Sequence, residues 1–114
     1  MVGKYKVITL CGSTRFKDEF LEAQKRLTLE GNIVISVGLF GHSGDEEVWT
    51  EGTKEMLYDM HKRKIDMADE VFVINVGGYI GIAGFKDKEI APLFSTARDI
   101  ENICLPKSFL EHIS

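Results

Sequence analysis

Residues Lys6–Phe16 read KVITLCGSTRF, an apolar run that breaks at Gly12 and opens into a helical pattern. Ser13 and Thr14 both favour helix N-cap positions, and the start of a helix can hold an anion with its unpaired N–H groups. Arg15 adds a guanidinium that suits a phosphate or a carboxylate. We therefore predict an anion-binding turn here, although an ordinary strand–turn–helix with a solvated arginine fits the same residues.

The rest of the chain alternates between strand and helix patterns, which predicts one α/β domain over residues 1–114. The periodicity predicts strands at Lys6–Cys11, Ile33–Val37, Glu70–Val76 and Asn102–Leu105, and helices at Thr14–Glu30, Thr53–Met67 and Ile90–Asp99. Because βαβ connections are right-handed, we expect a small Rossmann- or flavodoxin-like fold with three layers. Its parallel sheet would have about four strands in the order 2-1-3-4.

The apolar residues of the first two predicted helices indicate which side of each packs on the sheet. On the first helix these are Phe16, Phe20, Ala23 and Leu27. On the second helix they are Met56, Leu57, Met60 and Ile65. Residues three or four apart share a helix face, so we expect all of these side chains to point inward.

Glycines and polar residues gather where the predicted parallel strands end. The segments that follow the strands are Gly12–Arg15, Val37–Asp45 and Asn75–Gly81. In open α/β sheets ligands bind outside the carboxyl ends of the strands. Gly78 and Gly81 permit a close approach of backbone to ligand, and Tyr79 can stack on a sugar or a base. The alternative for this last segment is a flexible turn with a tyrosine on its rim.

Three carboxylates are candidates for nucleophilic or acid–base chemistry. Proline is tolerated only in the first turn of a helix, so Pro92 puts a helix start close to Glu89, a suitable position for a nucleophile. Asp66 and Asp69 bracket the end of the second predicted helix, and either can serve as a general acid. The structural alternatives are a capping-region charge at Glu89, a helix-ending turn at Asp69, and an ion pair of Asp66 with Arg63.

The composition restricts the classes of partner. The chain has 114 residues, 44% of them hydrophobic, and a net charge of −4, which argues against a nucleic-acid footprint. It has no apolar run of about 18 residues and no signal-peptide pattern before the first strand, so we expect a cytoplasmic protein without a membrane partner. Cys11 and Cys104 are expected to be reduced and buried.

Metal and cofactor motifs are missing from the sequence. His42 and His61 show no metal-ligand spacing with each other or with the cysteines. The chain also contains neither a Walker A motif nor the glycine fingerprint of dinucleotide-binding proteins after its first strand. We therefore expect no metal site and no cofactor.

Three segments, read together, resemble the nucleoside 2-deoxyribosyltransferase-like family, including its small phage and bacterial members. The segments are Cys11–Thr14 (CGST), Lys64–Asn75 (KIDMADEVFVIN) and Gly77–Gly81 (GGYIG). The resemblance implies a Rossmann-like fold that binds nucleosides or nucleotides and a glutamate nucleophile at the start of the helix after the glycine loop. The family's Glu-Ile pair corresponds to Glu89-Ile90, whereas its preceding Ser-Thr pair is absent from Gly81–Ile90.

The resemblance implies hydrolysis or transfer at the N-glycosidic bond of a (deoxy)nucleoside or nucleotide. A carboxylate, here Glu89, attacks the anomeric carbon to give a glycosyl-enzyme intermediate. A second carboxylate protonates the leaving base, and we favour Asp69 because it lies nearer the strand. The predicted ligand contacts are Gly12, Ser13, Thr14, Arg15, Gly78, Tyr79 and Gly81.

Two other readings of the chain stay open. The first is a non-catalytic nucleotide-binding module of the same fold. The second is an accessory protein whose acidic surface meets a protein partner. Arg15 beside the glycine turn favours a nucleotide over a nucleoside. We expect a homo-oligomer, with a small-molecule ligand and no nucleic-acid partner.

Overall fold

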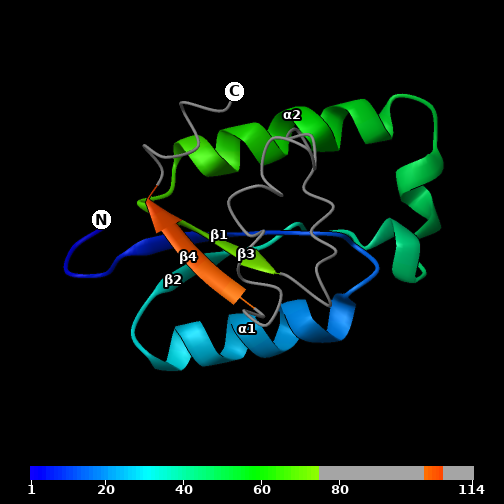
Figure 1. Cartoon of the computed structure of the whole chain (residues 1–114). Helices are drawn as coiled ribbons and strands as arrows, with labels where there is room; N and C mark the ends of the chain where they lie inside the picture. Colours follow the sequence, from blue (N-terminus) through cyan, green and yellow to red (C-terminus); the bar gives the residue numbers. More distant parts are fainter. Residues whose placement is uncertain (75–101, 107–114) are drawn as a thin grey trace, which may run out of the picture.

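The computed structural model describes residues 1–74 and 102–106 (Figure 1). In chain order the elements are β1 (Val7–Cys11), α1 (Lys17–Leu29), β2 (Ile33–Ile35), the short 3-10 helices η1 (Gly41–Ser43) and η2 (Glu46–Trp49), α2 (Thr53–Asp66), β3 (Glu70–Ile74) and β4 (Asn102–Pro106). The helix expected at Ile90–Asp99 lies outside the described residues. Neither of the α-helices described is long and apolar enough to cross a membrane.

The strands form one open sheet in the order β2-β1-β3-β4, as predicted. β1 pairs in parallel with both neighbours, so that Thr9 lies opposite Ile35 on β2 and Val71 on β3. β4 runs antiparallel to β3, and the prediction of a fully parallel sheet is wrong at this strand. An edge strand has one neighbour, and antiparallel pairing is slightly more stable per residue than parallel pairing. The apolar pattern of β4 therefore does not determine whether the strand runs parallel or antiparallel to β3.

Figure 1 shows α1 and α2 on opposite faces of the sheet, which gives the three layers expected of a small α/β fold. Alternate residues of a strand point to opposite faces. Toward α1 the sheet presents an apolar set that packs with three helix residues: Ile8, Leu10, Phe72 and Ile74 with Phe20, Ala23 and Leu27. The predicted inward face of α1 is therefore confirmed for its three buried members, and Phe16 is partly buried against them.

The layer between the sheet and α2 contains polar contacts as well as apolar ones. Thr9 is fully buried, and its Oγ1 donates a hydrogen bond of 2.8 Å to the carbonyl of Lys64. Cys11 is also fully buried, with its Sγ 3.4 Å from Nε2 of His61. Burying a polar group is unfavourable unless it is hydrogen-bonded. These side-chain contacts meet that requirement for Thr9 and Cys11.

The inward face of α2 differs from the predicted one. Met56 and Met60 are exposed at 53% and 39%, so the expectation that they face the core is wrong. The buried residues of the helix are His61 and Ile65, four residues apart on one face. The apolar spacing did not identify the buried face, because large apolar side chains are often exposed on protein surfaces. A buried polar side chain such as His61 is uncommon.

Candidate functional site

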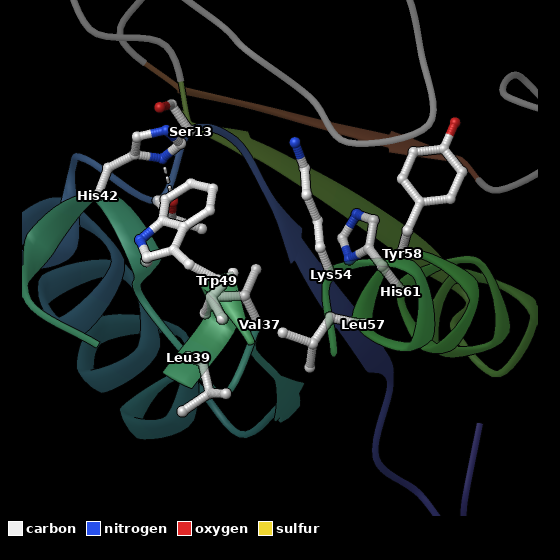
Figure 2. A pocket seen from close by; sticks show the side chains of 12 residues that line it. Ser13, Val37, Leu39, His42, Trp49, Lys54, Leu57, Tyr58 and His61 are labelled. Atoms are coloured by element: carbon white, nitrogen blue, oxygen red, sulfur yellow. Dashed lines mark hydrogen bonds between the residues drawn. The ribbon is translucent and has the colours of Figure 1, made fainter. Parts of the chain in front are cut away.

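A cavity of about 220 Å³ opens at the carboxyl ends of β1 and β2 (Figure 2). Its lining comes from the turn after β1 (Ser13, Thr14), from the segment after β2 (Val37, Leu39, Gly41, His42, Val48, Trp49) and from α2 (Lys54, Leu57, Tyr58, His61). The chain runs from β1 outward to β2 and then back past β1 to β3, so the strand order reverses at this place. Ligands of open α/β sheets bind at such a reversal.

Aromatic side chains lie on two sides of the cavity in Figure 2, with His42 and Trp49 on one side and Tyr58 on the other. Trp49 is 51% exposed, and its ring meets that of His42 edge to face with centroids 5.3 Å apart. Lys54 Nζ lies 5.7 Å from the Trp49 ring centroid, within the range of a cation–π contact. Tyr58 is also exposed and lies on the α2 side. These side chains offer flat apolar surfaces and a positive charge to a bound molecule.

The turn after β1 is tied to the segment after β2. Thr14 Oγ1 lies 2.7 Å from Nδ1 of His42, and Ser43 Oγ donates a 2.8 Å hydrogen bond to the carbonyl of Thr14. Ser13 is buried, and its Oγ accepts a long hydrogen bond of 3.4 Å from the Arg15 N–H. The two loops that form this side of the cavity are therefore held together by hydrogen bonds between them.

Neither Ser13 nor Thr14 caps α1, which corrects the sequence prediction. The helix begins at Lys17, with Phe16 at its N-cap position and no side-chain cap. The two hydroxyl groups are used in the contacts just described. The first turn of α1 contains Asp18 and Glu19, whose charges complement the positive end of the helix. The turn after β1 lies at the cavity, but no helix begins at Thr14. The prediction that the N–H groups of a helix start bind an anion there is therefore wrong.

Gly12 lets the chain pass close to β3. Its φ is +153°, and a Cβ built there would lie 3.1 Å from both Cβ and the carbonyl oxygen of Ile74. A side chain at this position would push the turn away from the end of β3. The glycine in the CGST segment therefore keeps the end of β1 and the end of β3 in contact at the edge of the cavity.

His61 and Cys11 form a buried pair at the cavity. His61 is 6% exposed and lines the cavity, and its Nε2 contacts Cys11 Sγ. Burial raises the pKa of the Cys11 thiol, so it is protonated at neutral pH. Burial, together with the charge of Lys64, lowers the pKa of His61 to about 4. The pair is therefore uncharged at neutral pH, and Cys11 lacks the thiolate that a nucleophilic cysteine needs.

Asp69 lies at the opposite edge of the sheet. Its Oδ1 accepts a 2.7 Å hydrogen bond from the Met1 amino group, and its Oδ2 accepts one of 2.8 Å from the Val7 N–H. The hydrogen bond with the Met1 amino group, followed by that with Val7, lowers the pKa of Asp69. A crossover helix returns the chain to the amino ends of the strands, so the residues after α2 are brought to that edge. The structure therefore separates Asp69 from the turn after β1.

Asp66 has the partner expected from the sequence. It ends α2, where its charge opposes the helix dipole. Arg63 Nη1 lies 3.3 Å from its Oδ2, and both side chains are well exposed. An exposed ion pair of this kind contributes little to stability. Asp66 is thus a surface residue of the amino edge and does not approach the cavity.

Other predicted site residues lie outside the described residues. They are Gly78, Tyr79, Gly81 and Glu89. Of the predicted ligand contacts that the structure describes, Ser13 and Thr14 line the cavity, while Gly12 and Arg15 flank them in sequence.

The cavity residues that were not among the predicted site residues include Trp49, Lys54, Tyr58 and His61. The last three share a face of α2 with Leu57, at spacings of three and four residues. The signal in the sequence is a helical stripe that mixes a lysine, an aromatic residue and a histidine with apolar residues. Trp49 lies in the predicted loop after the second strand and has no periodic signal.

No group of three or more His, Cys, Asp or Glu residues that could hold a metal ion occurs within residues 1–74. Comparison of the chain with protein-family models, with curated proteins and with solved structures gives no match. The resemblance to nucleoside 2-deoxyribosyltransferases stays a prediction from the three sequence segments.

Proposed function

We propose that this chain binds a nucleoside or nucleotide in the strand-end cavity, with the base against Trp49 and Tyr58. One observation carries the proposal: a cavity at the reversal of a parallel sheet has exposed aromatic rings beside a lysine. A nucleobase presents a flat π-surface that stacks on aromatic side chains. The position of the cavity is the one at which this class of fold holds its ligands.

The size of the cavity favours the base as the part of the ligand that enters it. Small-molecule pockets commonly measure about 300–1,000 Å³, and this cavity of about 220 Å³ is smaller. A base fits such a space, and the sugar and phosphate then extend toward the rim. Arg15, in the turn after β1, and Lys54, on the wall, are cations suited to a phosphate.

The charge around the cavity favours an anionic ligand. The whole chain has a net charge of −4, yet no Asp or Glu is among the described residues that line the cavity. A phosphate therefore meets the positive charge of Lys54 there and no carboxylate of the described lining. This local contrast supports a nucleotide over an uncharged nucleoside.

The reaction we propose is hydrolysis or transfer at the N-glycosidic bond, with Glu89 as the nucleophile. A carboxylate nucleophile is needed for a glycosyl-enzyme intermediate, and none lines the described part of the cavity. Glu89 is the residue that matches the family's Glu-Ile pair. Asp69 is left out of the proposed reaction because it lies at the other edge of the sheet. A non-catalytic nucleotide-binding module with the same cavity is the second candidate.

The test uses the full chain with deoxynucleosides and their 5′-monophosphates. Isothermal titration calorimetry measures binding, and chromatography measures the free base that is released. Binding with base release supports the enzyme, and binding without it supports the non-catalytic module. If no member of either series binds, the proposed function is wrong in both forms.

A further inference from the structure

Two buried side-chain polar atoms in the described part of the chain have no hydrogen-bond partner there, Ser36 Oγ and His61 Nδ1. Of the two residues, His61 lines the cavity. Figure 2 shows its ring on the α2 wall, between the side chains of Lys54 and Tyr58. A buried polar atom without a partner is unfavourable, and native structures rarely contain one without a reason. Nδ1 is the ring nitrogen that can still form a hydrogen bond, because Nε2 contacts Cys11.

The contact with Cys11 indicates which ring nitrogen holds the proton. Both groups are uncharged at neutral pH, since burial raises the pKa of the thiol and lowers that of the imidazole. One proton therefore lies between Sγ and Nε2, which are 3.4 Å apart. The thiol keeps its proton, and the described part of the chain gives Sγ no other hydrogen-bond partner, so the favoured arrangement has the thiol donating to Nε2. The ring then holds its own proton on Nδ1, which makes that atom a donor.

The surroundings of His61 make this donor selective. Leu57 and Val37 supply apolar surface to the same cavity. His61 itself has almost no contact with water. Nδ1 itself has almost no exposed surface, so the ring has to turn slightly toward the cavity before a ligand atom can accept its N–H. A second donor placed there would leave both N–H groups unpaired. Sites with a buried polar group reject ligands that cannot pair with it.

We propose that His61 Nδ1–H donates a hydrogen bond to an oxo group of the bound base. The cavity then prefers a base with an oxo group to the counterpart with an amino group, hypoxanthine to adenine and uracil to cytosine. The contrast is the one between an acceptor and a donor at the same place on a base edge. This inference rests on the proposed function, because it names the kind of base that the cavity selects.

The experiment compares matched pairs of ligands by calorimetry at neutral pH. The probes are the deoxynucleoside 5′-monophosphates of hypoxanthine and adenine, and those of uracil and cytosine. We expect the oxo member of each pair to bind about tenfold more tightly, the effect of one well-made hydrogen bond. His61→Phe keeps a ring and removes both nitrogens, so this preference should fall to less than about twofold.

A matched control is the other histidine of the cavity. His42→Phe changes the wall near Trp49, so it should alter the affinity for both members of a pair alike and keep the preference. Equal binding of oxo and amino ligands by the unaltered protein would overturn the inference while leaving the proposed function in place. Retention of the preference in His61→Phe would do the same. Failure of all four ligands to bind would overturn the proposed function and the inference with it.

A measurement on the unaltered protein covers the case in which His61→Phe does not fold. Nitrogen-15 NMR of the imidazole distinguishes a ring protonated on Nδ1 from one protonated on Nε2. We expect the Nδ1–H form for His61, with a change in the Nδ1 resonance when an oxo ligand is added. An Nε2–H form in the free and bound protein would contradict the inference.

Discussion

The two edges of the parallel sheet use their polar side chains differently. At the amino edge, Asp69 pairs with Met1 and Val7, and Lys6 Nζ lies 2.6 Å from Glu70. At the carboxyl edge, the cavity has exposed aromatic rings and a buried His61 Nδ1 that pairs with nothing in the described part of the chain. The amino edge therefore satisfies its polar groups within the protein, whereas the carboxyl edge leaves some for a ligand.

This contrast follows from the topology. The connection through α2 starts at the carboxyl edge and returns the chain to the amino edge. The start of α2 therefore lies beside the cavity, and its end lies beside the amino ends of the strands. Substitutions at the carboxyl edge should change binding and chemistry, and those at the amino edge should change stability alone. Variants at both edges test that difference.

The largest expected effect is on base release. If Glu89 is the nucleophile, Glu89→Gln keeps the shape of the side chain but cannot attack, and we expect base release to fall by at least about a thousandfold. Ligand affinity should stay within a few-fold. The matched control at the amino edge is Asp69→Asn, which should retain base release and lower the Tm. Chromatography of the free base together with thermal unfolding checks both variants.

Either variant can also contradict the proposed difference between the two edges of the sheet. Undiminished base release by Glu89→Gln would remove the nucleophile from the proposal. A large loss of base release in folded Asp69→Asn would mean that the amino edge takes part in the chemistry after all.

The next effect concerns the pH dependence of stability. Unfolded His61 takes up a proton below its ordinary pKa of 6.5, whereas in the folded protein it does so only below about 4. Between these pH values the unfolded state binds more protons, so the free energy of unfolding falls as the pH is lowered. We expect a loss of about 3 kcal/mol from this group. Urea unfolding at neutral pH and at about pH 4 measures it.

The control for this effect is His61→Phe, which removes the titrating group and should reduce the fall accordingly. Asp69 does not confuse the result, because its lowered pKa makes its stabilisation present above 3.8 and lost at lower pH. An equal fall in the variant and the unaltered protein would show that His61 is not held neutral by burial.

A smaller effect is expected at the aromatic wall. Stacking of a base on an aromatic ring contributes about 1–3 kcal/mol, so Trp49→Ala should weaken nucleotide binding by about thirtyfold. Trp49→Phe should restore part of the affinity. Tyr5 is an exposed aromatic residue outside the cavity lining, and Tyr5→Ala should leave binding unchanged. Calorimetry with one deoxynucleoside monophosphate compares the three variants, and equal affinities would exclude stacking on Trp49.

The smallest effect is expected at Arg15. Its exposed guanidinium should add modestly to phosphate binding, so Arg15→Ala should weaken binding of a monophosphate by about fivefold and leave the nucleoside unaffected. Arg63→Ala removes the same charge at the end of α2 and should change neither. A loss that is equal for nucleoside and nucleotide would mean that Arg15 acts on the shape of the turn and not on the phosphate.

The sequence predicted the layers of the fold because its signals are local. Apolar runs such as Val71–Ile74 and the stripe Phe20, Ala23, Leu27 give strands and a helix whose burial the structure confirms. The direction of β4 was not predictable from such signals, since the apolar pattern of an edge strand is the same in either direction. The order of the three parallel strands was still correct, because right-handed connections through helices leave few choices.

The site was predicted less completely because its contacts join distant parts of the chain. Thr14 reads as a helix cap, but its hydroxyl contacts His42, which lies 28 residues away. His61 shows no metal-ligand spacing in the sequence, but it lies on the buried face of α2 against Cys11. Asp69 directly precedes β3 in the sequence, so it lies at the amino end of that strand, at the edge opposite the cavity. The edge that holds the cavity followed from the fold, and the residues that line it needed the structure.

The most direct measurement uses the fluorescence of Trp49, because it is the one tryptophan of the chain and lines the cavity. Titration with a deoxynucleoside monophosphate is predicted to change its emission saturably, with the Kd that calorimetry gives for the same ligand. Ribose 5-phosphate, which lacks a base, is predicted to leave the emission unchanged. Binding seen by calorimetry without any change in Trp49 emission would place the base elsewhere and contradict the proposal that it lies against Trp49.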